Sequence, residues 1–319
     1  MRTIAMLTSG GDAPGMNSCI RAIARSALSA GLRVKGIRFG YDGLMRGDIY
    51  EMNVSSVADI IQKGGTILGT ARSAEFTSEE GQKKALRILK RFGIDGLIVM
   101  GGDGSMKGAE ALAKLGILTA GVPCTIDNDM GYTDYTIGFH TAVETVIESI
   151  GRLRDTSASH ARANIVQVMG RHCGDIALYA GLGGGAESVV VPEHEFDVKS
   201  ITDRIRRGKM RGKRHHIIVM AEGVGEPYQL KEDIMRLTGI ETRITILGHV
   251  QRGGSPSFTD AKLGCIMGER AVQALLEGHS SVAIGSHGQE FFTMPISEAV
   301  RIPHQLNENL YDLIGKLSS

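Results

Sequence analysis

The feature that most constrains the fold of this chain is a repeated alternation of short apolar runs with stretches of helical periodicity. The first run, residues 3–7, is followed by a glycine-rich break and by apolar residues at helical spacing over 16–28. Another helix is expected to begin at a capping box formed by Thr77 and Glu80 and to end at Gly93. Further runs of strand length lie at 96–100, 117–122, 165–169, 188–191, 217–220 and 244–247. Because strands that alternate with helices are typical of parallel sheets covered on both faces, the sequence predicts the α/β class.

Length, charge and cysteine spacing exclude several classes of protein. A chain of 319 residues is long enough for about two domains, at roughly 150 residues each. Its 36 basic and 35 acidic residues leave a net charge of +1, so we expect neither nucleic acid nor a membrane as a partner. No apolar run reaches the roughly 18 residues that span a bilayer, and the first residues lack a signal-peptide core, so a cytoplasmic location is expected. The four cysteines lie far apart and indicate buried thiols rather than a disulfide scaffold or a zinc site.

Glycine and polar residues follow most of the expected strands, and ligands of such sheets bind beyond the carboxyl ends of the strands. Two turns, 10–12 and 101–105, place backbone amides at a helix start, where they attract phosphate, although either alone could be a tight connection. Together they favour a polyphosphate ligand. Asp103 in the second turn would need a cation next to phosphate, which indicates Mg²⁺; the alternative is a helix N-cap.

Two carboxylates, Asp127 and Asp129, follow the run at 117–122 and would lie on one side of an extended loop. One could take a proton from a hydroxyl while the other faces a metal ion; an acidic surface loop is the alternative. No Walker-type P-loop occurs. The residues 181–186 match a dinucleotide fingerprint, but a helix-like stretch precedes them where a strand is required, so NAD binding is not favoured.

Scattered cations beside the expected strand ends suit a second anion such as a sugar phosphate, although each alone is more often a surface charge. They are Arg162, Arg171, Arg243, His249 and Arg252. A separate basic set in other stretches, Arg21, Arg25, Arg154 and 211–215, could form another phosphate site with Gly185 and Glu187.

These motifs, taken in order, resemble the bacterial ATP-dependent 6-phosphofructokinases over essentially the whole chain. The resemblance is carried by 7–17, 101–105, 125–129, 169–172 and 248–256. It implies two Rossmann-like three-layer α/β domains with mostly parallel sheets. The expected ATP-binding domain comprises 1–138 and 252–302, and the expected fructose 6-phosphate and effector domain comprises 139–251 and 303–319.

The resemblance implies Mg-dependent transfer of the ATP γ-phosphoryl group to the 1-hydroxyl of fructose 6-phosphate, a step of glycolysis. Asp127 would be the base, with Thr125, Arg171, Asp129 and Arg72 as further catalytic residues, and Asp103 would bind the metal. MgATP would be held by Gly11, Arg72, Ser73, Gly102, Asp103, Gly104 and Ser105. The sugar phosphate would be held by Thr125, Ile126, Asp127, Arg162, Met169, Gly170, Arg171, Glu222, Arg243, His249, Val250, Gln251 and Arg252.

The resemblance also implies allosteric control and a homotetramer, in which Arg162 and Arg243 reach the active site of a neighbouring subunit. ADP or GDP would activate and phosphoenolpyruvate would inhibit. The effector residues would be Arg21, Arg25, Asp59, Arg154, Gly185, Ala186, Glu187, Arg211, Lys213, Arg214 and His215.

The chain departs from the usual family pattern at Cys124, Ala161 and Thr77. Pyrophosphate-dependent relatives pair Lys at position 124 with Asp at position 104, so Cys124 and Gly104 favour ATP. Ala161 affects the expected strength of cooperativity, and Thr77 affects the expected preference for ATP over GTP. The alternatives are a pyrophosphate-dependent phosphofructokinase and a non-catalytic sugar-phosphate sensor, and the three intact carboxylates at 103, 127 and 129 disfavour the sensor.

Overall fold

A computed structural model describes residues 1–318, which form two compact units. Unit 1 comprises Met1–Ile126, Met130–Thr141 and Arg252–His304. Unit 2 comprises Asp127–Asp129, Ala142–Gln251 and the residues from Gln305 onward.

Unit 1 is built on a seven-stranded sheet with the order β11-β10-β5-β4-β1-β2-β3. The strands are β1 Thr3–Thr8, β2 Arg33–Ile37, β3 Ile49–Met52, β4 Gly96–Gly101, β5 Leu118–Pro123, β10 Val282–His287 and β11 Glu290–Pro295. The five inner strands run parallel, whereas β3 and β11 are antiparallel edge strands. Strands β1 and β4 are buried throughout, as expected for central strands covered on both faces.

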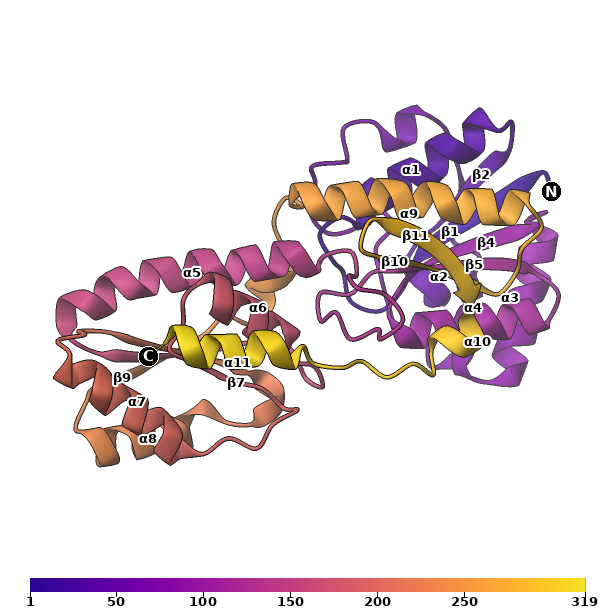
Figure 1. The fold of residues 1–319 in the computed structure, drawn as a ribbon. Coiled ribbons are helices and arrows are strands. Elements are labelled where there is room, and N and C mark those ends of the chain that lie inside the picture. Colours follow the sequence, from indigo (N-terminus) through magenta and orange to yellow (C-terminus); the bar gives the residue numbers. More distant parts are fainter. Residues whose placement is uncertain (319) are drawn as a thin grey trace. The chain divides into compact units, whose positions relative to one another are not determined.

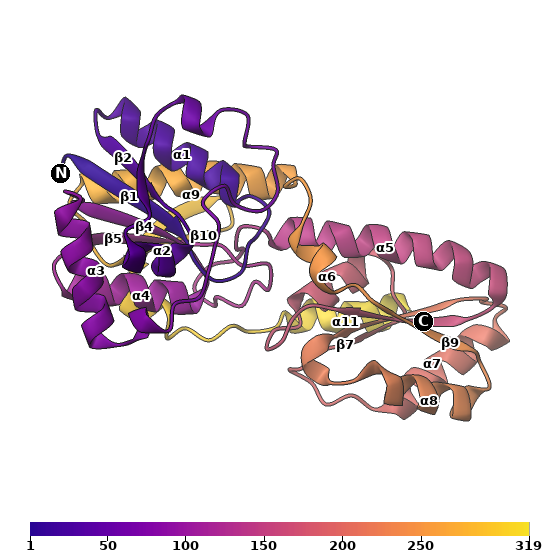
Figure 2. The same ribbon diagram turned by 180° about the vertical axis from the view of Figure 1, so that it is seen from behind.

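Helices cover both faces of this sheet, as Figure 1 and, from behind, Figure 2 show. They are α1 Met16–Ser29, α2 Gly40–Arg46, α3 Glu79–Arg91, α4 Asp103–Lys114, α9 Phe258–Leu276 and α10 Ile296–Ala299. Helices α2, α3 and α4 share one apolar core with the strands. On the other face α1 packs against α9, and Gly264 permits the close approach, because a Cβ there would lie 2.9 Å from the carbonyl oxygen of Gly15.

Unit 2 is built on a four-stranded, wholly parallel sheet with the order β7-β8-β6-β9. The strands are β6 Ala163–Val168, β7 Ser188–Val190, β8 His216–Ala221 and β9 Thr242–Ile246. The helices are α5 Phe139–His160, α6 Asp175–Gly183, α7 Val198–Met210, α8 Pro227–Thr238 and α11 Glu308–Leu317. Helices α7 and α8 pack on one face of the sheet, and α5, α6 and α11 lie on the other (Figure 1).

The two sheets confirm the predicted α/β class and the mostly parallel strands. Every strand run identified in the sequence is a strand, whereas β2, β3, β10 and β11 had not been identified. The predicted capping box is wrong: Ser78, not Thr77, caps α3 and accepts a hydrogen bond from the amide of Gly81 at 3.1 Å. Gly93 does end this helix, with φ at 64°.

Within residues 1–318, no helix combines the length and the apolar character that crossing a bilayer requires.

Candidate active site

The first glycine turn, between β1 and α1, is tightly packed by its neighbours. Gly10 has φ at 90°, a conformation that favours glycine. A Cβ at residue 11 would lie 2.3 Å from Nη1 of Arg252, so a larger residue there would displace that guanidinium group. The same nitrogen donates a hydrogen bond to the carbonyl oxygen of Asp12 at 3.2 Å. The structure therefore brings Arg252, a predicted sugar-phosphate residue, onto the turn predicted to hold a nucleotide.

The second glycine turn, between β4 and α4, is joined to the first. The hydroxyl of Ser105 donates a hydrogen bond to the carbonyl oxygen of Ser9 at 3.1 Å. The hydroxyl of Tyr41 donates to the backbone carbonyl oxygen of Ser105 at 2.8 Å. Gly102, not Asp103, occupies the N-cap position of α4. The first amides of a helix lack intrahelical acceptors and carry a partial positive charge. These amides belong to the second turn only, because the first turn ends before Gly15, the N-cap of α1; the prediction that both turns begin a helix therefore holds for the second turn and not for the first.

Asp103 is the first residue of α4, and its carboxylate pairs with Lys107 at 2.6 Å on the half-exposed surface. Such an i,i+4 pair is worth about 0.3–0.5 kcal/mol, so a cation easily displaces it. Mg²⁺ in phosphate sites commonly takes one or two carboxylates plus phosphate oxygens. Open space lies beside the turn, because a Cβ at residue 104 would meet no described atom within 4 Å. The donor present therefore fits a magnesium ion shared with phosphates.

A third segment, 66–73, lies beside the first glycine turn. The hydroxyl of Thr70 donates to the carbonyl oxygen of Gly10 at 2.7 Å, and that of Thr8 donates to the carbonyl oxygen of Gly69 at 2.8 Å. These bonds hold the exposed Arg72 and the half-buried Ser73 next to the turn. The structure thus brings together the predicted nucleotide residues of unit 1.

Strand β5 ends in a buried segment that leads toward the predicted base. The carbonyl oxygen of Thr125 accepts a hydrogen bond from the hydroxyl of Thr136 at 2.6 Å, and the side chain of Ile126 is fully buried. Cys124 is buried as well, and burial raises the pKa of its thiol, so this cysteine is not a reactive thiolate.

The Asp127–Asp129 segment is bent rather than extended. Asn128 has φ at 56°, in the left-handed region, so the condition under which the two aspartates would lie on one side of the loop is not met. Its buried side-chain amide donates to the buried carboxylate of Asp175, at the start of α6, over 2.8 Å. We had not identified Asn128 or Asp175 from the sequence, although asparagine tolerates the left-handed conformation better than most residues.

The predicted sugar residues lie largely at the carboxyl ends of the unit 2 strands, where Arg171, Glu222, His249 and Val250 are exposed. Gln251 is fully buried instead. Its side chain accepts a hydrogen bond from the amide of Met169 at 3.1 Å and donates to the carbonyl oxygen of Gly248 at 2.9 Å. The amide of Gly223 donates to the carbonyl oxygen of Gly170 at 3.1 Å. These bonds tie three strand ends into one surface.

Arg162 and Arg243 lie at the opposite, amino-terminal edge of the same sheet. Both arginines form ion pairs with Glu241. Nε of Arg162 lies 2.7 Å from Oε2 of Glu241, and Nη2 of Arg243 lies 2.6 Å from Oε1. Arg162 beside this carboxylate holds the pKa of Glu241 below its usual value. Within unit 2 these two arginines are therefore not brought to the predicted sugar residues.

The predicted effector residues fall in both units. In unit 2, Arg154 donates to the carbonyl oxygens of Gly184 and Gly185, at 2.5 and 2.8 Å. The buried Glu187 pairs with Lys213 and accepts a hydrogen bond from the amide of Ile217 at 2.5 Å. Burial lowers the pKa of His215.

The remaining effector residues are placed as follows: Ala186 is buried, Arg211 and Arg214 are exposed, and Arg21, Arg25 and Asp59 belong to unit 1. The hydroxyl of Ser18 donates to the carbonyl oxygen of Ile61 at 3.0 Å, which holds the segment that contains Asp59 against α1.

Comparisons with a family model, with curated relatives and with solved structures all point to the same family. Residues 3–275 match the phosphofructokinase family. The ATP-dependent 6-phosphofructokinase of Finegoldia magna is 61% identical and that of Clostridium tetani 56% identical, each over 318 residues that cover 100% of both chains. The solved phosphofructokinase of Saccharomyces cerevisiae is 35% identical, with a TM-score of 0.88 over 99% of this chain and 48% of the yeast chain. The chain thus belongs to the phosphofructokinase family.

Proposed function

We propose that this chain is an ATP-dependent 6-phosphofructokinase, which transfers the γ-phosphoryl group of ATP to the 1-hydroxyl of fructose 6-phosphate. The observation that carries the proposal is the joined pair of glycine turns, in which Ser105 binds the carbonyl oxygen of Ser9. The backbone amides at the start of α4, beside the exposed Gly10 and Gly11 of the first turn, suit a polyphosphate donor. The full-length identity to ATP-dependent 6-phosphofructokinases supports the choice of donor and acceptor.

The residues of unit 1 would bind the nucleotide. Gly11 and the 102–105 turn would face the phosphates with backbone amides, and Arg72 would neutralise negative charge on the transferring group. Asp103 would hold Mg²⁺, which when bound shields the phosphate charges and orients the terminal phosphoryl group. The open space at Gly104 is what an ATP phosphate would need, whereas an aspartate there would repel it.

Asp127 and the other predicted sugar residues, of which Thr125 and Arg252 belong to unit 1, would bind and activate the sugar. Asp127 would accept the proton of the 1-hydroxyl as its oxygen attacks phosphorus, and the left-handed turn at Asn128 would fix the direction of that carboxylate. Arg171 would stabilise charge in the transition state, together with Thr125. Met169, Gly170 and Glu222 would bind the sugar, and His249 and Arg252 its phosphate. Phosphoryl transfer depends on positioning and charge neutralisation, which this set of residues supplies.

The reaction can be tested with two donors. Purified protein with Mg²⁺ and fructose 6-phosphate should form fructose 1,6-bisphosphate with ATP and not with pyrophosphate. Asp127→Ala should lose nearly all turnover while still binding fructose 6-phosphate, and Asp312→Asn, at an exposed carboxylate on α11, is the control. Product with pyrophosphate alone would establish the pyrophosphate-dependent alternative, and product with neither donor would favour the sensor.

We also propose a homotetramer with shared active sites. Arg162 and Arg243 lie at the sheet edge opposite His249, so a second copy must provide them if they bind the same phosphate. Asp127→Ala subunits mixed with Arg243→Ser subunits should regain activity, because some mixed sites hold both native residues. No recovery in mixed tetramers would refute sharing.

Effector binding is the remaining part of the proposal. The positive surface of Arg154, Lys213 and Arg211, with Arg21 and Arg25, would take the phosphates of ADP or GDP as activators or of phosphoenolpyruvate as inhibitor. Arg154→Ala should remove the response of activity to both effectors and leave the activity at saturating fructose 6-phosphate unchanged within about threefold. An unaltered response would place regulation elsewhere.

A further inference from the structure

One carboxylate of unit 1 is fully buried, although none of the sequence motifs includes it. It belongs to Asp260, in the first turn of α9, and this residue is 0% exposed. Within residues 1–318, no basic side chain forms an ion pair with it. Burying a charge is costly unless hydrogen bonds replace those lost to water. The donors that surround Asp260 therefore show what this residue holds in place.

The donors to Asp260 lie at the amino-terminal end of α5. Oδ1 of Asp260 accepts a hydrogen bond from the amide of Gly138 at 2.9 Å, and Oδ2 accepts one from the amide of Thr141 at 2.7 Å. The hydroxyl of Thr141 donates to Oδ2 as well, at 2.5 Å. All three residues belong to unit 1. Because Asp260 also lies in the first turn of α9, the positive ends of two helix dipoles stabilise its charge.

These contacts fix the segment just before α5, which lies beside the end of β5. The hydroxyl of Thr136 donates to the carbonyl oxygen of Thr125 at 2.6 Å. The amide of Ile137 donates to the carbonyl oxygen of Pro123 at 3.0 Å. The segment that Asp260 holds thus supports the backbone of Thr125, a predicted catalytic residue.

The same segment packs against the residues that follow the first glycine turn, and two glycines permit the close approach. Gly138 has φ at 108°, and a Cβ there would lie 2.6 Å from the Cβ of Ala13. Gly15 has φ at 106°, and a Cβ there would lie 2.6 Å from Cγ2 of Ile137. Both the backbone conformation and the space therefore restrict these positions to glycine. A shift of the segment would disturb its neighbours on both sides.

A further link reaches the segment that carries Arg252, the predicted sugar-phosphate residue. The amide of Ser257, the N-cap of α9, donates to the hydroxyl of Thr141 at 2.9 Å. The hydroxyl of Ser257 accepts a hydrogen bond from the amide of Asp260 at 3.2 Å. Arg252 precedes Ser257 in the same segment, and its guanidinium group binds the carbonyl oxygen of Asp12. Thr141 and Asp260 thus hold the far end of the segment that begins at Arg252.

We propose that Asp260 is a positioning residue for phosphoryl transfer, because its carboxylate holds together the segments that carry Thr125 and Arg252. The inference rests on the proposed function, in which Thr125 stabilises the transferring group and Arg252 binds the sugar phosphate. Asp260 itself touches no substrate, since it has no exposed surface. Without its carboxylate, the backbone of Thr125 would occupy a wider range of positions. Small displacements of groups around a reacting centre lower the rate strongly.

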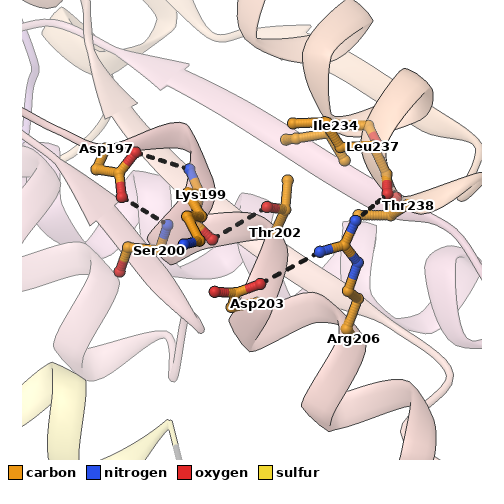
Figure 3. A network of polar contacts seen from close by, with 9 residues as sticks. All are labelled: Asp197, Lys199, Ser200, Thr202, Asp203, Arg206, Ile234, Leu237 and Thr238. Carbon is orange, nitrogen blue, oxygen red and sulfur yellow. Dashed lines mark hydrogen bonds and ion pairs between the residues drawn. The ribbon is translucent and has the colours of Figure 1, made fainter.

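The test uses Asp260→Asn in the full-length protein, a variant that keeps the shape of the side chain. Its amide group has one oxygen instead of two, so the two backbone amides now bound by separate oxygens cannot both keep their acceptors. Asp197→Asn is the matched control. Asp197 also binds two backbone amides at a helix start, those of Lys199 and Ser200 on α7, at 2.9 and 3.2 Å (Figure 3). It belongs to unit 2.

Hydrogen exchange measures the anchor without reference to activity. In Asp260→Asn, peptides that contain Ile137 and Gly138 should exchange at least about tenfold faster than in the native protein, and Asp197→Asn should leave their exchange unchanged. Formation of fructose 1,6-bisphosphate measures positioning, at a temperature where circular dichroism shows every variant to be folded. We expect kcat to fall at least about tenfold in Asp260→Asn. The KM for ATP should change less than about threefold, because the 102–105 turn makes none of these contacts.

Unchanged exchange at Ile137 and Gly138 would show that Asp260 is not the anchor and would overturn the proposal. Faster exchange with a kcat within about threefold of the native value would overturn it as well, because loosening the segment would then not affect catalysis. If Asp260→Asn fails to fold, Thr141→Val gives the same comparison, since it removes the hydroxyl that binds Asp260 and keeps the volume.

The control for Thr141→Val is Thr202→Val, which removes a buried hydroxyl bonded within α7 (Figure 3). Faster exchange and a lower kcat in Thr141→Val alone would support the anchor, and equal effects of the two valine variants would overturn it. A native protein that forms no product with either donor would refute the proposed function, which is a separate result from any difference between variants in exchange.

Discussion

The contact between Asn128 and Asp175 is expected to control turnover without touching the substrate. The Asn128 amide donates to the Asp175 carboxylate at 2.8 Å, and both side chains are at most 5% exposed. Asn128 itself occupies a left-handed conformation between the two aspartates. The variant Asn128→Gly keeps that backbone conformation accessible and removes only the side-chain anchor, so it separates the anchor from the turn.

The expected magnitude follows from the nature of this bond. A hydrogen bond to a charged group contributes about 1.5–3 kcal/mol. If that free energy holds the turn in the conformation that directs Asp127 at the sugar, its loss reduces the productive population by about 10- to 150-fold, since 1.36 kcal/mol corresponds to a factor of ten. We therefore expect kcat to fall by that factor in Asn128→Gly. The KM for ATP should remain unchanged within about twofold, because the nucleotide residues belong to unit 1.

The assay is steady-state formation of fructose 1,6-bisphosphate over a range of pH, with thermal unfolding measured on the same samples. Thr202→Val is the control for general destabilisation, because the buried hydroxyl of Thr202 bonds within α7, away from the turn. Asp175→Asn should lower kcat as well, and the double variant should be no worse than the more impaired single variant, since both remove one contact. A kcat within threefold of the native value in Asn128→Gly, with the native pH profile, would refute the positioning role.

Three further outcomes are expected. Gly104→Asp should lower kcat/KM for ATP at least about 100-fold, because its carboxylate repels phosphate. Gly104→Ala fills the same open space without charge and should retain most activity. Equal losses in the two variants would show that charge at position 104 is not the cause. Burial lowers the folded pKa of His216 to about 4, below its unfolded value of 6.5, so the stability from this group is present above pH 6.5 and is lost as pH falls. In the native protein, the free energy of unfolding in urea should fall between pH 7.5 and pH 5 by about 2 kcal/mol more than it falls in His216→Phe. An equal fall in the two proteins would exclude His216 as the cause. Ser78→Ala removes the cap of α3 and should lower the free energy of unfolding by about 0.5–2 kcal/mol. Thr77→Val should lower it by less. A larger loss in Thr77→Val would show that Thr77 is the cap.

The central strands and the glycine turns could be predicted because their signals are local. A buried parallel strand is a continuous apolar run, and a turn such as 101–105 combines several glycines with a helix start. The two edge strands escaped prediction because β3 is only half-buried and no residue of β11 is buried, so neither makes a continuous apolar run. The cap of α3 was misplaced by one residue because Thr77 and Ser78 are chemically equivalent candidates, and only the backbone shows which hydroxyl faces the free amide.

The parts of the site that escaped prediction depend on contacts between distant residues. Asn128 and Asp175 are 47 positions apart, and no local pattern links them. The same holds for Asp260, whose carboxylate binds backbone amides 122 and 119 positions away.

Arg162 and Arg243 show how strand direction limits what sequence reasoning can place. Both precede or begin parallel strands, while Met169 and His249 follow the same strands. At about 3.3 Å per residue, the seven steps from Arg162 to Met169 span roughly 23 Å, which is too far for both groups to bind one phosphate. Because β6 and β9 are hydrogen-bonded in a fixed register, this separation cannot close without breaking the sheet. If these arginines bind the sugar phosphate, the enzyme must assemble its active site from more than one copy of the chain.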